Sequence, residues 1–264
     1  MAALSDFFAP IASLTPLTLA FVALVLFAGA FIKGAVGFAL PTVAVAFVTM
    51  VLTPQETIGI LILPLLLTNL WQMVRQGLGA AWETARRFWR LNLLLVGLIG
   101  FVAQAVPHIA PETLVVVLGF VVSVAAALQL AGWRPKATSS GPARVRGEVV
   151  VGSAAGVVGG LTGVWGPPVL FYLIALGTPK TEQIRAQGTA FFLGSVVLMG
   201  AHLKSGVVNE VTLPVSVLMV VPVALGMALG LMAQDRLDAA RFRTVTLAVL
   251  CLAGLNLLRQ GLVG

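Results

Sequence analysis

The chain has 264 residues, of which 59% are hydrophobic and only 9% are charged, and its mean hydropathy is +1.05. Soluble domains carry roughly 25% charged residues, so this composition predicts an integral membrane protein without a separate soluble domain. The formal net charge of +7 does not indicate a nucleic-acid partner, because basic loops are the usual device that orients membrane helices.

The numbers and positions of cysteine and histidine argue against disulfides and metal sites. The single cysteine, Cys251, excludes an internal disulfide and a cysteine metal cluster, and His108 and His202 have no ligand spacing. No basic n-region precedes the first apolar run, so we expect no cleaved signal peptide.

Apolar segments follow one another at 17–33, 38–52, 57–74, 91–107, 112–132, 149–163, 166–177, 186–203, 212–233 and 244–260. A helix that crosses the bilayer needs about 20 residues. The first two segments form a pair that is short and interrupted by Gly and Pro, and so do the sixth and seventh. The other six segments are long enough to cross.

The two interrupted pairs carry the same motif, with an offset of 126 residues: 33–41 (KGAVGFALP) returns as 159–167 (GGLTGVWGP). Irregular backbone inside a bilayer is tolerated only where it is buried in protein or lines a wet cavity. Such interruptions at corresponding places in two hydrophobic halves are typical of the substrate site of a secondary transporter.

Lys and Arg cluster in three loops that the positive-inside rule places in the cytoplasm: Arg75, Arg86, Arg87 and Arg90; Arg134, Lys136, Arg144 and Arg146; Arg236, Arg241 and Arg243. Segment 149–177 must then leave the cytoplasm and return, and it is too short for two upright spans, so we expect two half-length helices. The N-terminus and the loop at 53–56 fall outside. One long tilted helix per hairpin, with parallel repeats, is the alternative.

We therefore predict an all-α polytopic membrane protein made of two homologous repeats with inverted topology, each a Gly/Pro-broken helical hairpin plus three transmembrane helices. The N-terminal repeat covers 1–135, a cytoplasmic linker covers 136–148, and the C-terminal repeat covers 149–264.

These motifs resemble those of the TauE/SafE family of bacterial sulfite and organosulfonate exporters. Residues 33–41 are similar to that family's N-terminal Gly-aromatic-Pro pattern, and 159–168 to its C-terminal Gly-rich pattern. Arg185-Ala186 and Phe191-Phe192 resemble the stretch that follows. The likeness spans nearly the whole chain, with Lys33 standing where the second half has Gly159. It implies export of a small sulfur-containing anion across the cytoplasmic membrane.

The charges near the membrane core favour an anion as substrate. All nine acids fall in loops or at span ends: Asp6, Glu56, Glu83, Glu112, Glu148, Glu182, Glu210, Asp235 and Asp238. Proton pumps and cation carriers keep acids or histidines in the pathway. Lys33, by contrast, lies between apolar runs, where a cation needs a cavity or a partner. It either faces a substrate anion, or it snorkels or neutralises a helix C-terminus.

The predicted substrate-binding residues are Lys33, Gly34, Gly37, Phe38, Asn69, Gly160, Thr162, Gly163, Trp165, Gly166, Arg185 and Gln187. The glycines either expose backbone N–H groups to an anion or allow close helix packing. Arg185 offers a fork for two oxygens or anchors the interface. Thr162 adds a hydroxyl. Asn69 and Gln187 either line the substrate pathway or form hydrogen bonds between helices. Trp165 either forms part of the wall of the site or packs against neighbouring side chains.

We therefore expect a secondary transporter and no enzyme, because the chain has no nucleophile–base pair, metal cluster or cofactor motif. Without a Walker-type loop, ATP is not a direct driver. Each exported negative charge gains about 2.3 kcal/mol per 100 mV, so a uniport needs no coupling carboxylate. Proton coupling through the acid group of the substrate itself, or export together with another ion, is the alternative. The alternatives are an anion channel, or a membrane protein that handles another sulfur compound or a carboxylate.

Overall fold

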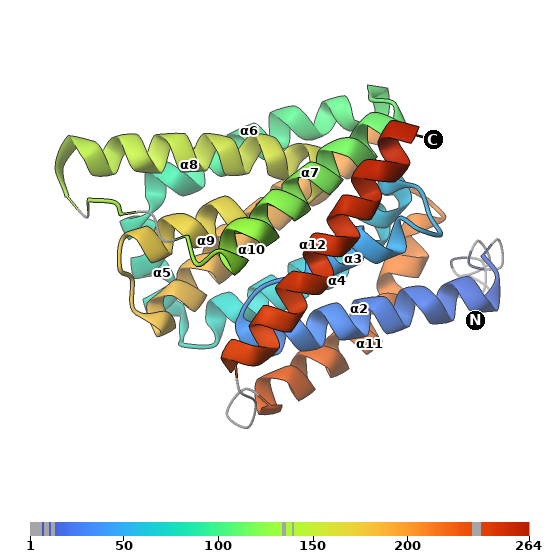
Figure 1. The fold of residues 1–264 in the computed structure, drawn as a ribbon, viewed down its shortest axis with the longest axis horizontal. Helices are drawn as coiled ribbons and strands as arrows, with labels where there is room; N and C mark the ends of the chain where they lie inside the picture. Colours follow the sequence, from blue (N-terminus) through green and yellow to red (C-terminus); the bar gives the residue numbers. More distant parts are fainter. Residues whose placement is uncertain are drawn as a thin grey trace.

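The structure, a computed structural model, describes residues 7, 11, 14–133, 136–138, 140–233 and 239–263. Every regular element within these ranges is a helix (Figure 1): α2 (Pro16–Val36), α3 (Leu40–Val48), α4 (Pro54–Val74), α5 (Leu78–Arg87), α6 (Trp89–Val102), the 3-10 helix η2 (Ala103–His108), α7 (Pro111–Leu130), α8 (Gly141–Thr162), α9 (Gly166–Ala175), α10 (Lys180–Ser205), α11 (Thr212–Ala233) and α12 (Ala239–Val263). Asp6, Arg134, Asp235, Arg236 and Asp238, which entered the charge argument, lie outside these ranges.

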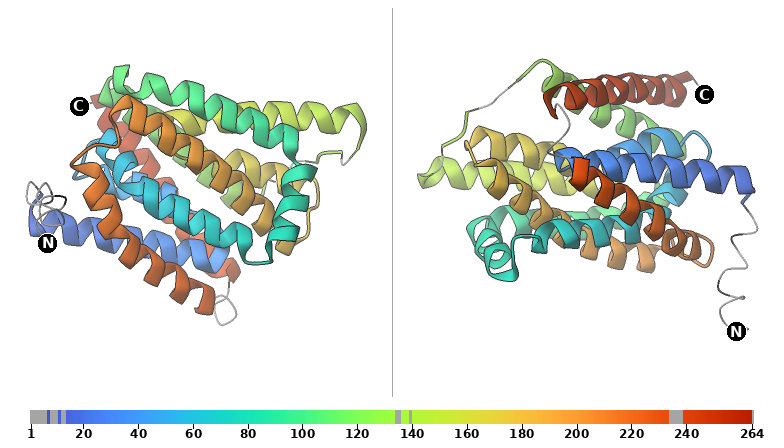
Figure 2. Two further views of the ribbon diagram at one scale, coloured as in Figure 1. Left: turned by 180° about the vertical axis from the view of Figure 1, so that it is seen from behind. Right: turned by 90° about the horizontal axis from the view of Figure 1, so that it is seen from below.

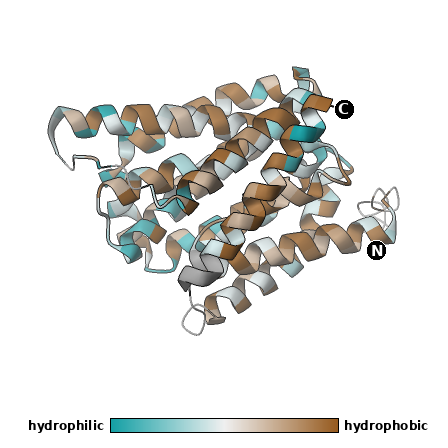
Figure 3. Cartoon of the chain, viewed as in Figure 1, coloured by the Kyte–Doolittle hydropathy of each residue, from teal (hydrophilic) through white to brown (hydrophobic). Residues whose placement is uncertain are grey.

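Within the described ranges, seven helices are long and apolar enough to cross a membrane: α2, α4, α6 continued by η2, α7, α10, α11 and α12. The six segments predicted to cross are among them. Figure 3 shows apolar residues along these helices, with hydrophilic residues gathered at the end of the bundle that holds α5 and the start of α8. The chain is therefore a multi-pass, all-α membrane protein, as predicted.

Each interrupted pair is a long helix followed by a short one. α2 has 21 residues and α3 has 9, whereas α8 has 22 and α9 has 10. The first arm of each hairpin is thus longer than the half-length helix that the sequence predicted. In the first hairpin the helix continues through Lys33 and Gly34, because one Gly in a helix interior costs only about 1 kcal/mol.

The long helices end at a glycine in the left-handed conformation. Gly37 has φ 91° and donates its N–H to Lys33 O at 2.7 Å, and Gly163 has φ 70° and donates to Gly159 O at 2.8 Å. Glycine adopts this conformation without the Cβ clash that other residues meet. Proline then follows within the first turn of both short helices, where its missing N–H removes no helical hydrogen bond. The breaks are therefore set by local sequence.

The helix boundaries follow the offset of 126 residues seen in the motifs. The ends of α2 and α8, the starts of α3 and α9, and the starts of α4 and α10 are each separated by that offset. α2 and α8 enter the bundle from opposite ends, and both stop near its middle (Figure 1). α5 has no helical counterpart, because a loop joins α10 to α11.

Close helix pairs hold the bundle together. α4 packs on α10, α2 on α11, α8 on α6, and α7 on α12; the right view of Figure 2 shows the α7–α12 pair at one edge. Glycines permit this approach: a Cβ on Gly34 would lie 2.5 Å from Met227 O, one on Gly160 would lie 2.7 Å from Val102 Cβ, and one on Gly119 would lie 2.6 Å from Leu258 N. Small residues let membrane helices approach closely in this way.

The segment predicted as a linker, 136–148, is partly helical, because α8 begins at Gly141. Glu148 is fully buried on this helix and accepts from Arg144 Nε at 2.9 Å, and Arg90 Nη1 lies 3.5 Å from its other oxygen. Arg144 O accepts from Tyr172 Oη at 3.3 Å. The paired acid ties α8 to α6, and the Arg144 carbonyl ties α8 to α9, both at the basic end of the bundle. Glu148 thus lies next to the start of the predicted span 149–163, within a helix that begins earlier than predicted.

Candidate functional site

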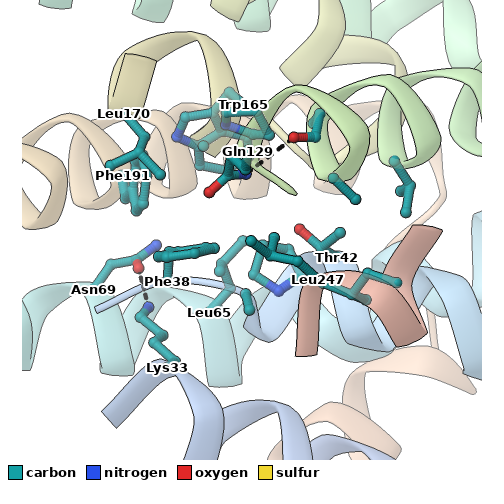
Figure 4. A pocket seen from close by; sticks show the side chains of 18 residues that line it. Lys33, Phe38, Thr42, Leu65, Asn69, Gln129, Trp165, Leu170, Phe191 and Leu247 are labelled. Atoms are coloured by element: carbon teal, nitrogen blue, oxygen red, sulfur yellow. Dashed lines mark hydrogen bonds between the residues drawn. The ribbon is translucent and has the colours of Figure 1, made fainter. Parts of the chain in front are cut away.

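A cavity lies where the two hairpins meet (Figure 4). All its lining residues come from the hairpins and from α4, α7, α10 and α12: Lys33, Phe38, Ala39, Pro41, Thr42, Leu65, Asn69, Val122, Ala125, Ala126, Gln129, Trp165, Gly166, Pro167, Leu170, Phe191, Leu247 and Leu250. The centre of a water molecule can reach about 30 Å³ of this space. That is room for about two waters, or for one small ion after a modest rearrangement.

Lys33 supplies the positive charge of this cavity. Its side chain is 2% exposed, and its Nζ donates to Thr68 Oγ1 at 3.0 Å and to Asn69 Oδ1. Both partners are neutral oxygens, and no Asp or Glu is among the residues that line the cavity. A buried ammonium without a counter-ion is costly, because neutral dipoles replace only part of its hydration. The site is therefore electrostatically prepared for an anion.

The starts of α3 and α9 face the same cavity. Ala39, Pro41 and Thr42 line it from the first short helix, and Gly166 and Pro167 line it from the second. A helix N-terminus carries unpaired N–H groups and a partial positive charge. Two such ends beside one lysine add to the positive potential of the same cavity, which again favours an anion.

Trp165 contributes a hydrogen-bond donor with no protein partner. Its side chain is 2% exposed, its ring packs edge-on against Phe191 with centroids 6.2 Å apart, and its buried Nε1 is without an acceptor in the described part of the chain. Buried indole N–H groups usually find an acceptor. An acceptor atom of a ligand in the cavity would satisfy this donor.

The lysine lies next to the contact between α4 and α10. Asn69, which accepts from Lys33, donates through Nδ2 to Ser195 Oγ at 2.8 Å. Both of these side chains are fully buried, and the two positions are related by the same offset of 126 residues. Gln72, one turn further along α4, donates to Gly37 O at 3.0 Å and to Ile184 O at 3.1 Å. A chain of hydrogen bonds thus connects the first hairpin to both central helices.

A smaller cavity adjoins Lys33 on the side of Arg75, with about 10 Å³ open to a water centre. Gly34, Gly37 and Gln72 line it together with the lysine. Lys33 therefore borders both the central cavity and the smaller one on the side where Arg75 ends α4.

Five of the predicted residues line the central cavity: Lys33, Phe38, Asn69, Trp165 and Gly166. Gly34 and Gly37 line the smaller one. At Gly34 and Gly160 a neighbouring helix occupies the space that a side chain would need, which fits the packing alternative. Gly163 ends α8, and Thr162 supports that end by accepting from Val164 N at 3.1 Å.

Arg185 lies away from the cavity and joins helices. Its Nε donates to Thr84 Oγ1 at 2.6 Å and its Nη1 donates to Gln76 Oε1 at 2.8 Å, which links α10 to α5 and the end of α4. Both of these donors therefore already bind protein groups outside the cavity. Gln187 is buried behind the first break, where its Oε1 would lie 3.8 Å from a Cβ on Gly37.

Sequence reasoning missed several residues of the site. Thr68 holds the lysine, and Thr42 and Gln129 are further polar groups in the wall. Each is a polar residue inside an apolar segment, which is the signal that had selected Asn69. Leu247 and Leu250 of α12 carry no such signal, because any apolar residue of that helix could have faced the cavity. Within the described ranges, no three His, Cys, Asp or Glu side chains come together as a metal site.

Glycine-broken hairpins, a cavity between them that a buried lysine lines, and apolar helices of spanning length define a multi-pass membrane transport protein. The family model for the sulfite exporter TauE/SafE matches residues 21–257, so the chain belongs to that family, a family of transporters in the cytoplasmic membrane. No curated protein and no solved structure matches the chain.

Proposed function

We propose that this protein is a secondary transporter that exports a small sulfur-containing anion, sulfite or an organosulfonate, through a site near the bilayer midplane. The observation that carries the proposal is the buried ammonium of Lys33, which has only neutral partners and shares one cavity with the starts of α3 and α9. Membership of the family supports the transport of a sulfur anion.

We further propose that the two halves are inverted repeats whose broken hairpins meet at the site. Three observations support this: the helix boundaries follow one offset, α2 and α8 enter from opposite ends, and the packing is reciprocal. The packing of α2 on α11 in one half corresponds to the packing of α8 on α6 in the other. The pairs α4–α10 and α7–α12 each join a helix of the first half to the equivalent helix of the second half. Relative motion of the two halves would then expose the cavity to either side in turn.

The orientation follows from the basic residues. We place the end that holds α5 and the start of α8 in the cytoplasm, because Arg86, Arg87 and Arg144 lie there. In a Cys251→Ala background, a Pro107→Cys variant should react with an external impermeant maleimide, whereas Lys136→Cys should react only after the membrane is opened. External labelling at Lys136 with protection at Pro107 would reverse the orientation.

Export of the anion needs no second ion. No carboxylate lines the cavity to carry a coupled proton, and an interior-negative potential of 100 mV favours the exit of each negative charge by about 2.3 kcal/mol. We therefore propose an electrogenic uniport.

The test is flux in proteoliposomes that contain the purified chain. With unlabelled sulfite inside and a trace of labelled sulfite outside, a carrier accumulates the label transiently by counterflow, whereas a channel only lets it equilibrate. A potassium gradient with valinomycin, which sets the potential, should accelerate net efflux when the interior is negative. Protein-free liposomes are the control. The absence of protein-dependent flux for sulfite and for organosulfonates would refute the proposal, and flux without counterflow would assign a channel.

A further inference from the structure

The end of the bundle that holds α5 carries most of the tryptophan of the chain. The side chains of Trp71, Trp82, Trp89 and Trp133 are 40–65% exposed, and they lie near the end of α4, in α5, at the start of α6 and just after α7. The fifth tryptophan, Trp165, is buried at the central cavity. Tryptophan is enriched where a membrane meets water, because its ring is apolar and its N–H is polar. This end therefore has the aromatic composition of a membrane interface.

Helix α5 lies crosswise to the long helices at this end (Figure 2, left view). Its inner face packs on α10: Ala81 and Thr84 are buried, and Thr84 Oγ1 accepts from Arg185 Nε at 2.6 Å. Its outer face carries Leu78 and Trp82, one turn apart, which are 72% and 65% exposed. A helix that lies across the bundle end with apolar side chains facing outward is typical of helices in the plane of a membrane interface. α10 thus holds α5 in an orientation that presents these side chains to the surroundings.

The exposed tryptophans of α4 and α5 each have an arginine one turn further along the helix. Trp71 is followed by Arg75, and Trp82 is followed by Arg86, so each ring lies on the same helix face as a guanidinium group. Both arginines are exposed, and among the described residues neither side chain has a hydrogen bond or an ion pair. Arg87, by contrast, is used in an ion pair with α10. Arg75 and Arg86 are therefore available to an anion from outside the chain.

We propose that these two Trp-x-x-x-Arg pairs bind the phosphate group of an anionic phospholipid, such as phosphatidylglycerol, in the cytoplasmic leaflet. The planar forks of Arg75 and Arg86 donate to the phosphate oxygens. The two indole N–H groups lie at the level of the head groups, and Leu78 packs against the acyl chains. This inference goes beyond the proposed transport function and uses only the orientation proposed with it.

The charges favour a lipid over a second copy of the chain as the occupant of this surface. Two unpaired arginines, Arg75 and Arg86, against one exposed acid of α5, Glu83, give the surface a net positive charge. A symmetric contact between two copies would double that charge within one interface, which is unfavourable. The head groups of an anionic leaflet neutralise it instead.

Isothermal titration of the purified full chain in a neutral detergent at low salt tests the proposal. The probes are dioctanoyl phosphatidylglycerol, dioctanoyl phosphatidylcholine as a zwitterionic control with the same acyl chains, and glycerol phosphate as a soluble head group. Each arginine near an anionic head group contributes about fivefold in affinity, so phosphatidylglycerol should bind about 10- to 25-fold more tightly than phosphatidylcholine. Glycerol phosphate should bind far more weakly, because it has no acyl chains.

Two double variants locate the charge. Arg75→Gln/Arg86→Gln should bring the affinity for phosphatidylglycerol to within about threefold of that for phosphatidylcholine. The unfolding midpoint should not change, because both side chains are exposed. The matched control is Arg146→Gln/Lys180→Gln, which removes two other exposed charges from the same end. Neither of these residues has a tryptophan one turn before it, so this variant should keep the preference for phosphatidylglycerol.

Trp71→Ala/Trp82→Ala should weaken both lipids by a similar factor and leave their ratio unchanged, because the rings do not read the head-group charge. Equal affinity of the unmodified chain for the two lipids, or an equal loss in both arginine and control variants, would overturn the proposal. Glycerol phosphate binding as tightly as phosphatidylglycerol would assign a soluble phosphate ligand instead. A dimer that the tryptophan variant dissociates, without selective lipid binding, would assign the surface to a second copy. Each of these results leaves the transport proposal to its own flux assay.

Discussion

Replacing Lys33 by Met removes the ammonium and keeps a side chain of similar length in the wall of the cavity. An anion about 4 Å from a lysine gains about 4 kcal/mol in surroundings with an effective dielectric constant near 20. That energy corresponds to nearly a thousandfold in the dissociation constant, and desolvation of the anion reduces the net gain. We therefore expect anion affinity to fall at least tenfold and up to about a thousandfold in Lys33→Met.

The same substitution should not destabilise the fold. It leaves Asn69 Oδ1 without its donor, at a cost of about 1–3 kcal/mol. It also removes a buried charge that has no counter-ion, and the cost of burying such a charge is several kcal/mol. The midpoint of thermal unfolding in detergent should therefore stay level or rise.

The assay is isothermal titration with sulfite and methanesulfonate, combined with flux at matched protein content. Lys204→Met is the control, because that lysine is exposed near the end of α10 and should shift affinity less than threefold. Affinity of Lys33→Met within twofold of the original would refute the reasoning. A large loss of stability with unchanged affinity would instead make Lys33 a structural residue.

Three further substitutions test the hairpins, with Gly97→Ala as the control because a Cβ there meets no atom within 4 Å. Gly163→Ala places a side chain at φ 70°, so it should cost about 1–2 kcal/mol of stability and also weaken anion binding by displacing the start of α9. Gly160→Ala should lower the unfolding midpoint without changing affinity, since its Cβ would press on Val102. Ala39→Gly should raise stability by up to about 1 kcal/mol, because Ala39 has φ 101°. The explanation for Gly163 would be wrong if Gly163→Ala melted like Gly97→Ala. The explanation for Gly160 would be wrong if Gly160→Ala lost anion affinity, and the explanation for Ala39 would be wrong if Ala39→Gly had a lower unfolding midpoint.

The sequence by itself determined the class of protein and the places where the chain breaks. Hydropathy located six of the seven described helices that are long enough to cross, because a span needs about 20 apolar residues. The two motifs located the ends of α2 and α8, since a left-handed glycine followed by proline stops a helix through local backbone geometry alone. Lys33 could also be singled out from the sequence, because a cation between apolar runs is costly to bury unless it faces a cavity or a partner.

Only the tertiary structure decided which residues face the cavity. Gly34 and Gly160 turned out to contact neighbouring helices, although both belong to the same motifs as the cavity residues. Arg185 turned out to bridge α10 to α5. Leu247, more than 200 positions from Lys33, lines the same space as the lysine. Nearly uniform apolar helices carry little amphipathic pattern, so sequence cannot tell which of their faces meets protein and which meets lipid. That choice depends on how helices distant in sequence pack against one another, and packing is a property of the whole bundle.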